Sequence, residues 1–185
     1  MIDDIQQDAD ARMRKTVDAT RDEMNRIRTG RASPALLDHL MVEYYGVQTP
    51  VSQVATVAVA DARTLTVQPW EKNMIAAIEK SILESDLGVN PVVAGAIMRI
   101  PLPPMTEERR RELGKLVKRE GENGKVAVRN IRRDAIHTVR ELLKEKAVSQ
   151  DQGKRAEGAL QSLTDRYIAV IDQVVSEKER EVVEI

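Results

Sequence analysis

A long segment without proline, residues 106–146, most constrains the fold of this chain. Apolar residues recur along it at intervals of three and four or their multiples, so they share one stripe of an α-helix. The stripe is formed by Leu113, Val117, Val128, Ile131, Ala135, Val139 and Leu142. Gly121 and Gly124 fall on the same stripe, where they either permit close approach of another helix or soften this one. The segment is therefore predicted to be one helix that packs along its length.

Basic side chains gather roughly opposite this stripe, within an arc of about 140°. They form the basic ridge, defined as Lys115, Lys118, Arg119, Lys125, Arg129, Arg132, Arg133, Arg140 and Lys144. The segment holds 13 of the 29 Lys and Arg residues but only 8 of the 30 Asp and Glu residues. A charged helix face is usually just solvated, but sorting by sign favours phosphate binding, and arginine suits bidentate contacts.

Two further segments share the helical pattern. Residues 2–28 carry apolar side chains at every third or fourth position, and Gly30 and Pro34 prevent continuation. Ser149 and Gln152 have capping-box spacing, which predicts the start of a final helix. Its predicted seam is Ala156, Leu160, Leu163, Tyr167, Val170 and Val174. Each apolar seam must be buried against the other two, so an antiparallel three-helix bundle is expected.

The segment between the first two predicted helices lacks a long helical pattern and instead shows patterns typical of short strands. Strand candidates are residues 40–45, 54–59, 64–68 and 96–100. Residues 73–85 are predicted to form a short helix that buries Met74, Ile78, Ile82 and Leu83. The fold class is therefore α+β, with a bundle of residues 1–30 and 106–185 and an inserted small β/α/β domain of residues 31–105.

Two short crossings connect the predicted domains. Gly30 can absorb dihedral change, whereas the prolines of the second crossing are stiff. The predicted hinge consists of Thr29, Gly30, Arg31, Pro103, Pro104 and Met105. A fixed interface between the domains is the alternative.

The residues that enzymes use for chemistry are scarce here. There is no Cys, and the two histidines, His39 and His137, lie far apart in sequence without a ligand motif. The N-terminal cluster of Asp3, Asp4, Asp8 and Asp10 favours a helix start more than a cation site. We therefore expect no catalytic residues, no metal and no cofactor, and hence no enzyme.

The composition of the chain argues against several classes of binding partner. The net charge of −1 argues against a generally basic nucleic-acid coat, and the chain has one Trp, three Tyr and no Phe for stacking bases. No long apolar run or targeting segment is visible, so no membrane association is expected.

Six stretches together resemble the bacterial ribosome recycling factor family over essentially the whole chain. They are residues 28–34 (RTGRASP), 43–46 (EYYG), 85–88 (SDLG) with 90–91 (NP), 99–104 (RIPLPP), 106–110 (TEERR) and 128–135 (VRNIRRDA). The resemblance implies an L-shaped molecule, similar to tRNA in outline. It also implies a monomer that acts in the cytoplasm to release ribosomes from mRNA after termination.

The resemblance further implies partners and site residues. The bundle would bind large-subunit rRNA at the intersubunit face, and the smaller domain would meet elongation factor G, which with GTP splits the ribosome into subunits. The expected rRNA-binding residues are Arg132, Arg129, Arg133, Arg28, Arg31 and Lys125. Alternatives from other classes are a helical adaptor or chaperone-like protein that binds proteins through its bundle, and an RNA-modifying enzyme.

Overall fold

The computed structural model describes residues 1–183, and these form two compact units. The first unit consists of Met1–Arg28 and Glu108–Val183, and the second contains Thr29–Glu107. Among the described residues, this division differs from the predicted domain boundaries at residues 29–30 and 106–107, and residues 184–185 of the predicted bundle lie outside the described part of the chain. Each unit has its own buried core.

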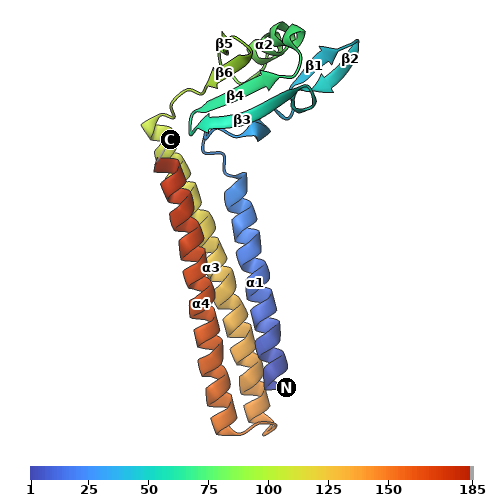
Figure 1. The fold of residues 1–185 in the computed structure, drawn as a ribbon. Coiled ribbons are helices and arrows are strands. Elements are labelled where there is room, and N and C mark those ends of the chain that lie inside the picture. The colour runs from blue at the N-terminus through green and yellow to red at the C-terminus, as the bar shows by residue number, and fades with distance from the viewer. Residues whose placement is uncertain (184–185) are drawn as a thin grey trace. The chain divides into compact units, whose positions relative to one another are not determined.

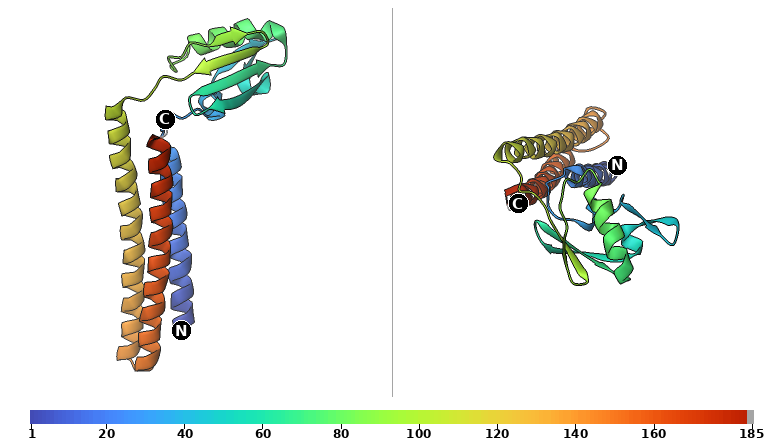
Figure 2. Two further views of the ribbon diagram at one scale, coloured as in Figure 1. Left: turned by 60° about the vertical axis from the view of Figure 1, so that its left-hand side comes forward. Right: turned by 90° about the horizontal axis from the view of Figure 1, so that it is seen from above.

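The first unit is built from three long helices, α1 (Ile2–Arg26), α3 (Glu107–Lys144) and α4 (Gln150–Val183). The helices lie side by side, with α3 antiparallel to α1 and α4 (Figures 1 and 2). The first helix ends before the predicted residue 28, because Ile27 already has extended backbone angles. Within residues 1–183, no helix is long and apolar enough to cross a lipid bilayer.

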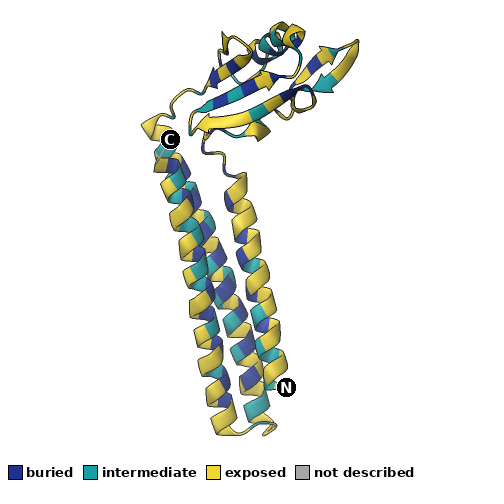
Figure 3. Ribbon diagram, viewed as in Figure 1, coloured by how far each residue is buried: buried dark blue, intermediate teal, exposed yellow. Residues whose placement is uncertain are grey.

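Buried residues follow the inward faces of all three helices (Figure 3). In α3 the predicted stripe is confirmed except at Leu142, which is only partly buried. In α4 the predicted seam is partly wrong. Ala156, Leu160 and Tyr167 are buried as expected, but Thr164 and Ile171 take inward positions. The residues predicted there but only half-buried are Leu163, Val170 and Val174.

A threonine enters the α4 seam because its polar group is satisfied locally. The Thr164 hydroxyl donates a hydrogen bond of 2.7 Å to the carbonyl of Leu160, one turn earlier. A buried hydroxyl without such a partner would be costly, whereas this bond lets threonine replace an apolar residue. Sequence patterning by polarity alone therefore missed this position.

Gly121 and Gly124 are both buried in α3, which is a continuous helix through them. A Cβ on Gly124 would lie 2.5 Å from Oγ1 of Thr20 in α1, and a Cβ on Gly121 would overlap the side chain of Val175 in α4. The two glycines therefore permit close helix approach, the first of the two alternatives left open by the sequence.

The predicted capping box at the start of α4 is confirmed. The Ser149 backbone N–H donates to Oε1 of Gln152 at 2.8 Å, and the Gln152 N–H donates to Oγ of Ser149 at 3.2 Å. The two bonds satisfy backbone donors that have no partner within the helix.

The second unit combines short strands with the helix α2 (Ile75–Leu83). Its strands are β1 (Met41–Tyr44), β2 (Val47–Pro50), β3 (Ala55–Asp61), β4 (Thr64–Pro69), β5 (Val92–Ala94) and β6 (Ile97–Pro101). Strands β1 and β2 form an antiparallel hairpin, and the other four form an antiparallel sheet in the order β3-β4-β6-β5.

The core of this unit lies between α2 and the inward side chains of the strands. Leu65, Ile78, Ile82, Met98 and Ile100 are all fully buried there. Leu83, predicted to be buried, is instead 54% exposed at the last turn of α2. Ile78 and Ile82 share one helix face, and Leu83 points about 100° away from Ile82.

Candidate nucleic-acid interface

The basic ridge lies on the part of α3 that faces away from the bundle core, and none of its nine residues is buried. Its central part surrounds a hollow of about 390 Å³. The hollow is lined by Arg129, Asn130, Arg132, Arg133, Ile136, His137 and Arg140. Four arginine residues therefore line one concave surface, which is a suitable arrangement for several phosphate oxygens.

Several ridge cations are paired with side chains of α4. Arg132 donates from Nη1 to Oε1 of Gln161 at 3.0 Å, and Arg140 donates from Nε to Oε1 of Glu157 at 3.0 Å. Lys125 is half-buried and forms an ion pair with Asp172. These partners orient the cations before any ligand binds, and the carboxylates also reduce the local positive charge.

The remaining two arginines of the central cluster differ in their partners. Arg129 forms an ion pair with Glu122 on the same helix, at 3.1 Å. Arg133 is exposed and makes no hydrogen bond or ion pair within residues 1–183. Arg133 therefore offers a full charge without first breaking an internal contact.

Arg28 and Arg31, the other predicted rRNA contacts, fall in different units. Both are exposed, but Arg28 belongs to the unit with the bundle and Arg31 to the smaller unit. The residues gathered at the hollow are thus Arg129, Arg132 and Arg133, together with Arg140, while Lys125 lies just over one helical turn earlier on α3 than Arg129.

The predicted hinge residues lie on two connections that approach each other. Gly30 has a φ of +77°, a left-handed conformation that favours glycine, and a Cβ placed on it would lie 3.1 Å from Cε of Met105. Pro103 and Pro104 are exposed, and Thr29 is buried. Any larger residue at position 30 would be strained in its backbone and crowded against Met105.

Sequence reasoning missed the α4 residues that border the ridge. Glu157, Gln161 and Asp165 follow each other at intervals of four, so they lie on one face of α4. Because α4 runs antiparallel to α3, residues of increasing number along α4 lie beside residues of decreasing number along α3. That spacing was the available signal, but it becomes useful only once the register of the two helices is known.

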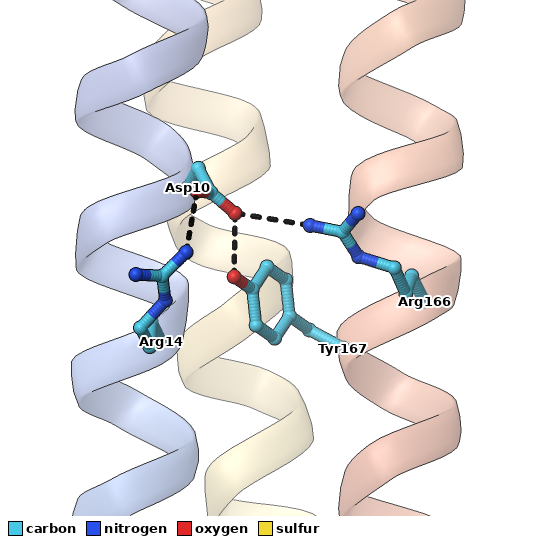
Figure 4. Close-up of polar contacts among 4 residues, drawn as sticks. All are labelled: Asp10, Arg14, Arg166 and Tyr167. Carbon is cyan, nitrogen blue, oxygen red and sulfur yellow. Dashed lines mark hydrogen bonds and ion pairs between the residues drawn. The ribbon is translucent and has the colours of Figure 1, made fainter.

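A second polar cluster joins α1 to α4 (Figure 4). The Asp10 carboxylate accepts hydrogen bonds from the Tyr167 hydroxyl at 2.5 Å, from Arg166 at 3.1 Å and from Arg14 at 3.1 Å. The Tyr167 hydroxyl, followed by the charge of Asp10, raises the pKa of Arg14 above its ordinary value. The cluster links α1 to α4 through hydrogen bonds and ion pairs.

No group of three or more His, Cys, Asp or Glu side chains in residues 1–183 is arranged to hold a metal ion. Two of the N-terminal acidic residues form ion pairs with groups close in sequence. Asp4 lies 3.6 Å from the terminal ammonium, and Asp8 lies 3.9 Å from Arg12. Asp3 and Asp4 lie in the first turn of α1, where carboxylates interact favourably with the helix dipole.

A family model for ribosome recycling factor matches residues 20–183 of the chain. The chain belongs to the ribosome recycling factor family. The ribosome recycling factor of Legionella pneumophila (strain Paris) is 57% identical over 185 residues, with 100% of both chains covered. The resemblance seen in the six sequence stretches is thereby confirmed.

Solved structures of ribosome recycling factors match over nearly the whole chain. A solution structure of a ribosome recycling factor is 41% identical with a TM-score of 0.66, and covers 100% of this chain and 98% of its own. A second structure holds models for the T. thermophilus ribosome recycling factor and the E. coli elongation factor G bound to the E. coli post-termination complex. It is 45% identical with a TM-score of 0.61, covering 98% of each chain. The α+β fold class is confirmed.

The helical adaptor alternative is not favoured. It required exposed apolar seam residues for binding other proteins, but the seams of α1, α3 and α4 are buried against one another (Figure 3). The family model and the similar proteins are all named ribosome recycling factors.

Proposed function

We propose that this protein is a ribosome recycling factor that works with elongation factor G and GTP. Together they split the post-termination ribosome into subunits and so release it from mRNA. Membership of the family over the full chain supports this proposal, and the arginine-lined hollow on α3 carries its physical part. The solved complex of a relative with elongation factor G on a post-termination ribosome supports the choice of partners.

The bundle binds rRNA of the large subunit at the intersubunit face through the basic ridge. Arg132 and Arg133 are the leading contacts, with Arg129 and Lys125 on the same helix and Arg28 and Arg31 as further contacts. Each phosphate that a cation neutralises releases condensed counterions, so the affinity falls steeply as salt rises. The net charge of −1 limits adhesion to RNA in general, because the chain as a whole is not attracted to it.

The protein acts as a mechanical component and not as an enzyme. Elongation factor G hydrolyses GTP and supplies the free energy, and the smaller unit receives its push. The hinge transmits that push to the bundle. It consists of Thr29, Gly30, Arg31, Pro103, Pro104 and Met105. The left-handed conformation of Gly30 supports this role, since it allows backbone angles closed to other residues. The protein acts as a monomer in the cytoplasm, without a membrane partner.

Sedimentation of post-termination ribosomes tests the function directly. The ribosomes are incubated with this protein, elongation factor G and GTP, and each component is omitted in turn. Conversion to separate subunits only when all three are present is the expected result. Ribosomes that stay intact in the complete mixture would contradict the proposal.

The role of the ridge is tested by Arg132→Ala. Loss of one phosphate contact should weaken binding to purified large subunits about tenfold and lower the slope of log affinity against log salt by about 0.9. Arg21→Ala is the matched control, because Arg21 is an exposed arginine on α1 outside the ridge. Helicity should stay at the wild-type value in both variants, and unchanged affinity in Arg132→Ala would remove Arg132 from the interface.

A further inference from the structure

Gln161 of α4 differs from the neighbouring α4 partners of the basic ridge, because it carries no charge. Along the border of the basic ridge, Arg140 and Lys125 are each paired with a carboxylate, of Glu157 and Asp172 respectively. The partner of Arg132 is Gln161, a neutral amide. The positive charge of Arg132 is therefore left uncompensated by its direct partner, although its position is held.

The orientation of the Gln161 amide follows from a third side chain. Nε2 of Gln161 donates to Oδ1 of Asp165 at 2.8 Å, and Oε1 accepts from Nη1 of Arg132 at 3.0 Å. A carboxylate only accepts hydrogen bonds and a guanidinium only donates them. With Asp165 on one side and Arg132 on the other, only one orientation of the amide satisfies both neighbours.

We propose that Gln161 is a positioning residue for Arg132, which holds the guanidinium at the rim of the hollow while leaving its charge available to a phosphate of rRNA. The inference rests on the proposed function and deepens it. A carboxylate at position 161 would hold the same guanidinium but would compete with phosphate for it. A side chain without an acceptor would leave the guanidinium free to rotate.

The substitution Gln161→Glu separates positioning from charge, because the two side chains have nearly the same shape. We expect binding to purified large subunits to weaken about tenfold, as in Arg132→Ala, since phosphate must now displace an internal ion pair. The slope of log affinity against log salt should fall by about 0.9, the contribution of one phosphate contact. A purely structural role would not change that slope.

Gln152→Glu is the matched control. It introduces the same charge on the same helix, about 13 Å along the axis from position 161, beyond the screening length of about 8 Å at physiological salt. Glutamate at position 152 can still accept the Ser149 N–H that Gln152 accepts now. Affinity for large subunits should therefore remain at the wild-type value in this control.

A double-mutant cycle shows whether Gln161 acts through Arg132. In the Arg132→Ala background, Gln161→Glu should change affinity less than about twofold, because the cation on which it acts is gone. An equally large loss in both backgrounds would mean general repulsion of RNA and would overturn the inference. Thermal unfolding of Gln161→Glu at or above the wild-type midpoint, together with weaker binding, supports competition and contradicts simple misfolding.

Failure of the inference and failure of the proposed function give different results. If Arg132→Ala weakens binding but Gln161→Glu does not, the positioning role is wrong and the proposed interface stands. If Arg132→Ala binds large subunits like the wild type, Arg132 is not part of the interface and the inference fails with it. Gln161→Met, which keeps the length without an acceptor, should weaken binding less than Gln161→Glu and leave the salt slope unchanged.

Discussion

At the scale of single residues, Tyr167 stabilises the bundle both by burial of its ring and by the hydrogen bond of its hydroxyl. Tyr167 is buried in α4, yet its hydroxyl reaches the Asp10 carboxylate on α1, and the guanidinium of Arg166 lies 5.1 Å from the centre of its ring. The ring fills the core while the hydroxyl links two helices that are far apart in sequence. Such a residue contributes both apolar burial and a charge-assisted hydrogen bond.

Tyr167→Phe isolates the hydrogen bond from the packing. The ring stays buried, but Asp10 loses the hydroxyl, so we expect the free energy of unfolding of the bundle to fall by about 1.5 kcal/mol. Urea unfolding followed by helical circular dichroism measures this. A variant that unfolds at the wild-type urea concentration would show that the hydroxyl contributes nothing to stability.

Two tyrosines in the smaller unit share one acceptor. The Tyr44 hydroxyl donates to Oε1 of Glu71 at 2.7 Å, and the Tyr45 hydroxyl donates to Oε2 at 3.1 Å. The hydrogen bond to Glu71, assisted by burial, raises the pKa of Tyr44 from 10.0 to about 12, and the same carboxylate raises the pKa of Tyr45. Both phenols therefore stay protonated, and able to donate, to a higher pH than a free tyrosine.

This pair predicts a loss of stability at alkaline pH. A folded-state pKa above the unfolded value stabilises the folded state fully below pH 10, and the contribution disappears as the pH rises towards 12. Denaturant unfolding followed by Trp70 fluorescence, below pH 10 and near pH 12, should show a smaller pH-dependent loss in Tyr44→Phe than in the wild type. An equal loss in both proteins would assign the effect to other groups.

At the scale of elements, the glycines of α3 differ in whether a neighbouring helix lies close to them. Gly124 approaches Thr20 of α1, and the side chain of Ile171 in α4 is also within 3.3 Å of a Cβ placed there. Gly114 has no atom within 4 Å of such a Cβ. The same residue type therefore serves close packing at one position and has no packing role at the other.

Alanine substitutions at these two glycines should have opposite signs. In Gly114→Ala the higher helix propensity should stabilise the bundle by up to about 1 kcal/mol, since the new methyl group has space. In Gly124→Ala the methyl group would push α1 away, and overpacking of about 1–3 kcal/mol should exceed the propensity gain. Thermal unfolding of both variants measures the difference, and stabilisation of Gly124→Ala would contradict the close-approach role.

The β1–β2 hairpin illustrates an element that was not recognised from sequence. Its two-residue turn consists of Tyr45 with a φ of +49° and Gly46 with a φ of +79°. Both positive values are required by the tight turn that matches the twist of the strands. Tyrosine rarely adopts this conformation, so the turn did not stand out, and strand β2 after it was missed. The hydrogen bond from Tyr45 to Glu71 helps to hold it there.

At the scale of the whole molecule, two separate cores stabilise one chain. The bundle core is centred on residues such as Met13, Leu160 and Ile171, and the core of the smaller unit on Ile78 and Met98. Each unit buries its own apolar surface. Two-state unfolding of the entire chain is therefore not expected.

Two probes should separate the transitions. The only tryptophan, Trp70, lies in the smaller unit, whereas almost all helical residues lie in α1, α3 and α4. Ile78→Ala should cost about 2–5 kcal/mol in the transition followed by Trp70 fluorescence and leave the helical transition in place. Ile171→Ala should do the reverse. Transitions that shift together in both variants would indicate one cooperative unit.

Patterning along the chain was sufficient for features that depend on neighbours in sequence. The intervals of three and four predicted all three long helices, and the spacing of Ser149 and Gln152 predicted a capping box that forms as expected. Sorting of charge along α3 located the basic ridge. These features arise from the geometry of a single helix, so one segment contains all the information they need.

Features that depend on distant segments became visible only in the folded chain. The Gln161 amide meets Arg132 because of the antiparallel register of α4 on α3, and Asp10 meets Tyr167 through the packing of α1 on α4. Thr164 could be buried because a local hydrogen bond satisfied its hydroxyl, and Gly124 was needed because Thr20 lies against it. Periodicity identifies the faces of helices, but the rotation and register of packed helices decide which side chains meet.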